Sequence, residues 1–199
     1  FCVTFDKSNK TARTGTNTFY VPYPALFREC EVKNRMMKRT ISGMTGTGSL
    51  AHNRRDFIAE NVNQNRVYLN ICYRDENLKD VYKELFDESV ERYNVGKRND
   101  RKITNYYDKI QHGKQEKLFH EVIFQIGNNK DMAAGTPDGD RAVKVLDEYM
   151  QDFQRRNPTL RVFCCYLHQD EATPHLHIDF VPYVTGWKGK GMDTRAVSY

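Results

Sequence analysis

The sequence lacks a long hydrophobic run. No stretch of its 199 residues approaches the roughly 18 apolar residues that a membrane-spanning helix needs. The first residues, FCVTFDKSNKTARTG, also lack the basic start and apolar stretch of a secretory signal peptide. We therefore expect a cytoplasmic protein without membrane insertion.

Cysteine is scarce, and its spacing follows no known metal or disulfide pattern. The chain has five cysteines and no C-x-x-C pair: Cys2, Cys30, Cys72, Cys164 and Cys165. An odd number without that spacing excludes a zinc knuckle and disfavours a disulfide framework. We expect these residues to be reduced thiols.

A nucleotide-binding P-loop is also missing. The segment Ser42–Arg55 (SGMTGTGSLAHNRR) is rich in glycine but has no GK[ST]. Glycine-rich backbone can still approach a phosphate closely. The formal net charge of +5 and the pI of about 8.9 suit a polyanionic partner such as nucleic acid.

The pattern of apolar residues predicts helices and strands in mixed order. Apolar residues recur at helical spacing over 78–93 and 142–153, and more weakly within 96–117. Short β-branched and aromatic runs predict strands at 67–72, 119–126, 160–168 and 175–183. This order indicates an α+β fold, with a central antiparallel sheet and helices packed mainly on one face.

The chain divides into an extension and one domain. Residues 1–35 mix Thr, Asn, Tyr and Pro without a period, so we expect an irregular N-terminal extension. Residues 36–199 are long enough for a single core. We hypothesise that Met36 or Met37 is a natural start site, which mass spectrometry of the natural N-terminus would test.

Three histidines are concentrated in the segment YLHQDEATPHLHIDFVPY. His175 and His177 are two residues apart, so on a strand both imidazoles share one face. His168 ends the preceding strand, and an antiparallel turn would bring it beside them. Three neutral imidazoles on a rigid sheet can hold a divalent ion with positions left open. Asp170 and Glu171, in the turn, can orient an imidazole or accept a proton. The alternative is a strand that carries surface histidines by chance.

The motif HxDExTPHLHIDFVP resembles the third motif of the Mob/Pre (MobV-type) plasmid mobilisation relaxases, which belong to the HUH endonuclease superfamily. AHNRRDF at 51–57 resembles their first motif, HNxR, and VYLNICY at 67–73 resembles their second. FHEVIFQIG and LDEYMQDFQRRNPTLRVF are similar to the intervening scaffold. The resemblance extends from about Met37 to Arg195.

This resemblance implies an enzyme that nicks one DNA strand at a plasmid transfer origin for conjugative mobilisation. It implies a divalent metal, Mn²⁺ or Mg²⁺, and a covalent 5′-phospho-protein intermediate. The implied metal ligands are His168, His175 and His177. His52 is the implied nucleophile, Arg55 would neutralise the scissile phosphate, and Glu171 would orient or deprotonate His52. A coupling protein of a secretion system is a family partner.

A tyrosine is the competing choice of nucleophile. Many relaxases use one, and the sequence offers several tyrosines that could instead belong to the core or stack on DNA: Tyr68, Tyr73, Tyr106 and Tyr107.

Basic side chains outside the motif are candidate phosphate contacts. Those predicted to bind DNA are Lys38, Arg39, Arg54, Arg98, Arg101 and Lys102. For each of them, a solvated charged surface is the alternative.

The sequence ends at GMDTRAVSY, whereas family members continue into further helices, so we expect a nicking domain truncated at its C-terminus. Two other functions stay open. A non-catalytic, truncated DNA-binding remnant would bind DNA without nicking it. A metal-dependent hydrolase of another substrate would need no DNA, because three histidines and a carboxylate also suit hydrolysis.

Overall fold

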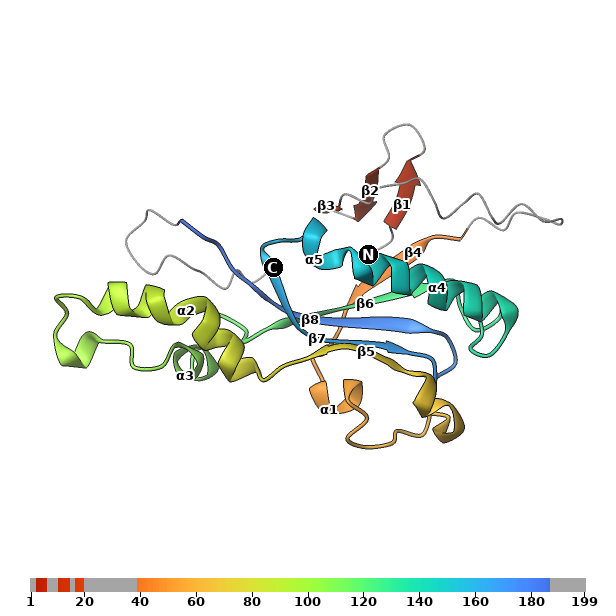
Figure 1. Cartoon of the computed structure of the whole chain (residues 1–199), viewed down its shortest axis with the longest axis horizontal. Helices are drawn as coiled ribbons and strands as arrows, with labels where there is room; N and C mark the ends of the chain where they lie inside the picture. The colour runs from red at the N-terminus through yellow and green to blue at the C-terminus, as the bar shows by residue number, and fades with distance from the viewer. Residues whose placement is uncertain (1–2, 7–10, 15–16, 20–38, 187–199) are drawn as a thin grey trace.

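A five-stranded antiparallel sheet forms the centre of the molecule in the computed structural model (Figure 1), which describes residues 3–6, 11–14, 17–19 and 39–186. The strand order is β4-β6-β8-β7-β5, and every neighbouring pair is antiparallel. The strands are β4 (Ile41–Thr45), β5 (Ile71–Asp75), β6 (His120–Ile126), β7 (Leu160–His168) and β8 (His175–Pro182). The predicted α+β class is therefore confirmed.

Pairing between the two central strands places the histidines. In β7 and β8, His168 lies opposite His175 and Tyr166 lies opposite His177. On the other side of β8, Ile123 of β6 lies opposite His177. Because side chains alternate along a strand, His175 and His177 project from one face, and Leu176 projects from the other.

The helices α4 (Pro137–Gln151) and α5 (Phe153–Arg156) cover the face opposite the histidines. The Thr136 side chain accepts a hydrogen bond from Gly139 N at the start of α4, and Pro137 takes the first turn, where a missing N–H costs little. The residues in this core, all buried, include Leu146, Phe153, Phe124, Leu176 and Ile178.

The helices α2 (Leu78–Asn94) and α3 (Tyr106–Gln111) pack on the histidine face, where Phe86 and Ile110 bury against Phe163 and Val181. The short α1 (Leu50–Asn53) also contacts β7, and in Figure 1 it lies on the side of the sheet away from α4. The expectation of helices mainly on one face thus needs correction. The central strands are apolar on both faces over part of their length, so both faces need cover.

Two segments differ from their predicted structure. Residues 67–69, the start of the strand predicted at 67–72, belong instead to the 3-10 helix η1 (Gln64–Leu69), and β5 begins only at Ile71. The Asn63 side chain accepts from Asn65 N, and the Asn70 side chain accepts from Gln169 N, which fixes the turn on both sides. Within 96–117, only η2 (Asn99–Arg101) and α3 are helical.

Short strands occur in the segment expected to be irregular. They are β1 (Val3–Asp6), β2 (Thr11–Thr14) and β3 (Asn17–Phe19), joined in an antiparallel sheet. The boundary at residues 35/36 and the C-terminal truncation stay predictions, and residues 187–199 lie outside the described part of the chain. Among the described residues, no helix is both long and apolar enough to cross a membrane.

Candidate active site

The three predicted ligand histidines form one buried cluster. The ring centroid of His168 lies 5.3 Å from that of His175 and 4.8 Å from that of His177, and the last two are 4.9 Å apart. The exposed fractions of the three residues are 0%, 8% and 4% in sequence order. Burial of three imidazoles in contact requires that they stay largely neutral or share a cation.

One nitrogen of each ring is held by an oxygen. His168 Nε2 lies 2.9 Å from the Asn53 carbonyl, His175 Nδ1 lies 2.8 Å from the Thr173 carbonyl, and His177 Nδ1 lies 2.7 Å from Glu121 Oε1. Carbonyl and carboxylate oxygens accept, so these nitrogens carry the protons and donate.

The opposite nitrogens then carry lone pairs. Among the buried atoms of the described residues, His168 Nδ1 and His177 Nε2 have no hydrogen-bond partner. Neutral imidazoles oriented through one nitrogen and open at the other fit the requirements of a divalent metal site.

Two overlapping groups of potential ligand atoms meet in this cluster. The atoms of His52, His168 and His177 lie within 4.8 Å of one another, and so do those of His168, Glu171 and His175. His168 belongs to both groups. The arrangement therefore offers His52 and Glu171 as further ligand atoms, and the predicted set of three histidines stays a prediction.

Burial favours the neutral form of His168, His175 and His52. Burial lowers the pKa of His168 and of His175, and the neighbouring His177 lowers both further. Burial also lowers the pKa of His52, as does the positive charge of Arg55. A neutral ring is the form that can bind a metal or attack an electrophile.

A four-residue helix and its terminal turn carry His52 and Arg55. Ser49 caps α1 by accepting from His52 N. At the other end Arg55 adopts a left-handed conformation with φ of 60°, and its N–H donates to the His52 carbonyl while Asp56 N donates to the Ala51 carbonyl. These two bonds form a Schellman motif, in which glycine is usual at the left-handed position.

The predicted catalytic residues lie together around Arg55. The guanidinium donates to both Asp170 oxygens, at 2.8 and 2.7 Å, and to Glu171 Oε1 at 2.8 Å. Arg55 Nη1 lies 3.1 Å from His52 Nε2, and Glu171 Oε1 lies 3.3 Å from the same atom. Because arginine can only donate, His52 Nε2 meets Arg55 with its lone pair. All five guanidinium N–H groups are thus engaged, by Asp170, Glu171 and His52, so a phosphate can bind this arginine only by taking the Nη1 donors from His52.

Three residues at this site were missed by the sequence analysis: Asn53, Glu121 and Asp179. Asn53 Nδ2 donates to Glu121 Oε1 at 2.9 Å and to Asp179 Oδ2 at 2.8 Å. Their signal was available, because Glu121 and Asp179 are acidic residues inside otherwise apolar strands. Such residues are buried only when they are paired or hydrogen-bonded.

The two carboxyl groups differ in charge. Burial alone raises the pKa of Glu121, but hydrogen bonds from His177, Asn53 and the Gly48 backbone lower it to about 2. Burial and the adjacent Glu121 charge raise the pKa of Asp179 to about 7. Glu121 is therefore an ionised acceptor that fixes the His177 ring.

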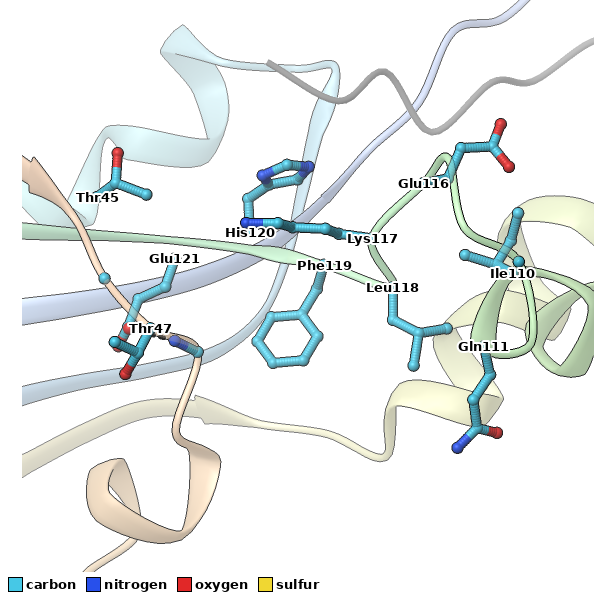
Figure 2. A pocket seen from close by; sticks show the side chains of 13 residues that line it. Thr45, Thr47, Ile110, Gln111, Glu116, Lys117, Leu118, Phe119, His120 and Glu121 are labelled. Atoms are coloured by element: carbon cyan, nitrogen blue, oxygen red, sulfur yellow. Dashed lines mark hydrogen bonds between the residues drawn. The ribbon is translucent and has the colours of Figure 1, made fainter.

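A shallow cavity of about 320 Å³ lies beside Glu121 (Figure 2). It is lined by the loop after β4 and by the segment that leads from α3 into β6. In Figure 2 the Glu121 and Phe119 side chains lie on one side of β6 and His120 on the other. Gly46 is required here, because a Cβ on it would lie 1.9 Å from Glu121 Oε2.

The change Glu121→Gln is predicted to weaken metal binding by about 10- to 100-fold, the usual effect of losing an outer-sphere partner. The amide keeps the shape but removes the negative charge that accepts from His177 Nδ1. Isothermal titration with Mn²⁺ measures the change, and the exposed Glu60→Gln variant is the control. Equal affinities in the wild type and Glu121→Gln would contradict this role.

The predicted DNA-contact residues lie in several surroundings. Those placed by the structure include Arg54, paired with Asp75 at 2.6 Å, Arg39, paired with Asp131 at 2.5 Å, and Arg98, paired with Asp100 at 2.5 Å. Arg101 and Lys102 are exposed. The segment that contains them follows the end of α2 farthest from the sheet, and the structure does not bring it to the histidine cluster (Figure 1). Lys38 lies outside the described residues.

The competing tyrosines are mostly engaged elsewhere. Tyr73 donates to Asp147 at 2.6 Å, and Tyr106 is buried against Tyr82 and Phe86. The Tyr107 ring packs edge-on against Tyr82 and Tyr68 is 81% exposed, so neither is held against the histidines by a recorded ring contact.

Comparison with solved structures finds the MobM relaxase domain bound to plasmid pMV158 transfer-origin DNA. The 22-nucleotide, manganese-bound complex at pH 5.5 is 20% identical with a TM-score of 0.43, and 74% of this chain and 72% of that chain are covered. The 23-nucleotide complex at pH 6.5 is 21% identical with a TM-score of 0.41, covering 76% of this chain and 71% of that chain. Among curated proteins, none matches.

Comparison with family models is more decisive. The model described as plasmid recombination enzyme, Mob_Pre, matches residues 32–194. This span is well over half of the 199 residues and contains the candidate site. It also confirms the resemblance carried by the motifs around His52 and His177. The chain therefore belongs to the Mob_Pre family of plasmid recombination enzymes, the DNA relaxases.

Proposed function

We propose that this protein is a metal-dependent endonuclease and transesterase that nicks one strand at a specific site in a plasmid transfer origin. The observation that carries the proposal is that two sets of side chains lie next to each other in the structure. One is a cluster of buried imidazoles in which two ring nitrogens, His168 Nδ1 and His177 Nε2, have no hydrogen-bond partner, and the other is the pair His52 and Arg55. The first suits a divalent cation and the second suits a phosphodiester.

The residues that would hold the metal are His168, His175 and His177. Bound there, Mn²⁺ or Mg²⁺ would polarise a non-bridging phosphate oxygen as a Lewis acid. The chain's own contribution is to orient the three rings, through the acceptors on Asn53, Thr173 and Glu121. Burial favours the neutral form of His168 and His175 by lowering the pKa of each.

In the proposed reaction, the Nη1 group of Arg55 exchanges its contacts with His52 for the scissile phosphate and neutralises its charge, and a neutral nitrogen of His52 attacks the phosphorus. A nitrogen–phosphorus bond forms and the bond to the 3′-oxygen breaks. The ring loses its remaining N–H proton to solvent and the 3′-oxygen takes one from solvent, which leaves a free 3′-hydroxyl and the 5′-phosphate on the protein. Glu171 orients His52 by holding Arg55 in place. The covalent intermediate retains the bond so that the strand can be rejoined.

The experiment that tests this function is adduct trapping. The protein is incubated with Mn²⁺ and a labelled, single-stranded transfer-origin fragment, and the products are separated on a denaturing gel. We expect a labelled protein–DNA adduct that EDTA prevents. DNA binding without nick or adduct would support the non-catalytic remnant, and turnover of another ester without DNA would support the hydrolase.

Metal is predicted to stabilise the fold, because it binds the assembled histidines of the native state. At a free Mn²⁺ concentration 100 times the dissociation constant, the gain is about 2.7 kcal/mol. Thermal unfolding with and without Mn²⁺ measures it. The gain is expected to disappear in His168→Ala, whose ring belongs to both groups of ligand atoms. An equal gain in that variant would place the metal elsewhere.

A further inference from the structure

An exposed aromatic side chain lies next to the candidate nucleophile. The Phe57 ring centroid is 6.3 Å from that of His52, with 54° between the ring planes, and the residue is 51% exposed. Neither buried cluster of the described residues includes Phe57. A single exposed apolar side chain is ordinary on a protein surface, but this ring is in contact with the candidate nucleophile, where the substrate strand would lie.

The backbone that leads to this ring is ordered. The Schellman motif at the end of α1 holds Arg55 and Asp56 through hydrogen bonds to the His52 and Ala51 carbonyls. Phe57 is the next residue, and the Arg55 side chain is anchored by Asp170 and Glu171. The ring therefore directly follows an ordered turn, and within the residues that the structure describes its one ring contact is with His52.

A ligand bound here must place an anionic group next to a planar apolar group. Arg55 and His52 suit a phosphate, and Phe57 offers a flat apolar face beside them. A nucleotide has this pairing of groups, because a phosphodiester and a planar base lie side by side. Stacking of a base on an aromatic side chain is common in single-strand recognition and tolerates any base.

We propose that Phe57 is a positioning residue, on which a nucleobase next to the scissile phosphate stacks so that the phosphate is aligned with His52. This inference rests on the proposed function. It assigns to Phe57 a contact with the substrate strand, and it makes no use of base-specific hydrogen bonds.

Affinity for single-stranded DNA provides the first test, with a twelve-nucleotide oligothymidylate as the probe and fluorescence anisotropy as the measurement. Removing one base–aromatic stack in Phe57→Ala is expected to weaken binding about fivefold or more. Phe57→Leu should also weaken binding of the oligothymidylate, whereas Phe57→Tyr, which keeps an aromatic ring, should bind it as the wild type does. The neighbouring Ile58→Ala, at a residue 46% exposed, is the matched control and should change little.

Fluorescence provides a test of stacking itself. Trp187 is the only tryptophan in the sequence and can be replaced by phenylalanine. In that background Phe57→Trp should be strongly quenched when the oligothymidylate binds, and Ile58→Trp should be quenched much less. Equal quenching at the two positions, or equal affinity of wild type and Phe57→Ala, would overturn the proposal.

The two levels of the hypothesis can fail separately. If Phe57→Ala weakens binding but the wild type forms no adduct with origin DNA, stacking stands and nicking fails. If the adduct forms, Phe57→Ala matches the wild type in affinity and KM, and Phe57→Trp and Ile58→Trp are quenched equally, nicking stands and the stacking role is wrong. Isothermal titration with Mn²⁺ should give the same metal affinity for the wild type and for Phe57→Ala.

Discussion

The His52→Ala variant is expected to lose covalent adduct formation by about 10³-fold or more, as for other nucleophile deletions. The reason is geometric. His52 Nε2 lies 3.1 Å from Arg55 Nη1, so a phosphate that takes this Nη1 donor lies directly beside the ring. The measurement is the rate of adduct appearance on a denaturing gel, with Mn²⁺ and origin-containing single-stranded DNA.

The variant must keep its metal and its fold for this result to be meaningful. His52 is one quarter exposed at its side chain, so truncation leaves a surface gap and not a core cavity. Because His52 can also contribute a ligand atom, Mn²⁺ affinity is measured in parallel. A loss of adduct with less than tenfold loss of Mn²⁺ affinity identifies a nucleophile, and a parallel loss of both identifies a ligand.

A full-rate adduct in His52→Ala would point to a tyrosine. Tyr166 is the one to replace next, because its ring centroid is 6.1 Å from that of His168. Its hydroxyl donates to Asp75 at 3.0 Å, and burial together with hydrogen bonding to Cys72 and Asp75 raises its pKa. A hydroxyl that holds its proton more tightly is a weaker nucleophile. With His52 present, the Tyr166→Phe variant is therefore expected to nick DNA normally.

The Arg55→Ala variant is expected to lower the free energy of unfolding by about 3 kcal/mol or more. The Arg55 side chain is 6% exposed and its partner Asp170 is fully buried. Removing the cation leaves a buried carboxylate without its charge partner, and that cost exceeds the loss of the contact itself. Urea unfolding followed by circular dichroism measures the change at constant m-value.

An exposed ion pair on the neighbouring residue provides the control. Arg54 pairs with Asp75 at 2.6 Å, with both side chains about one third exposed at 31% and 33%. Arg54→Ala is therefore expected to cost at most about 1 kcal/mol. The double variant Arg55→Ala/Asp170→Asn should recover part of the stability, because the buried charge is then gone. Equal losses for Arg54→Ala and Arg55→Ala would show that burial of the Asp170 pair contributes nothing.

Local patterns in the sequence determined the elements and half of the site. Alternation in HLHIDF put His175 and His177 on one face, since side chains on a strand alternate whatever the rest of the fold. The short turn after His168 made an antiparallel pair with β8 the simplest connection. Amphipathic spacing likewise predicted α2 and α4, because each needs a continuous apolar stripe.

Only the tertiary structure decided what surrounds the histidines. Glu121 reaches His177 because β6 pairs beside β8, a strand order that no local pattern encodes. Asn53 meets Glu121 and Asp179 because α1 docks on the sheet through contacts between residues far apart in the chain. The sequence by itself determined which residue types are available and which faces they share. Strand order and helix docking decided which of them meet, because both depend on the packing of the whole core.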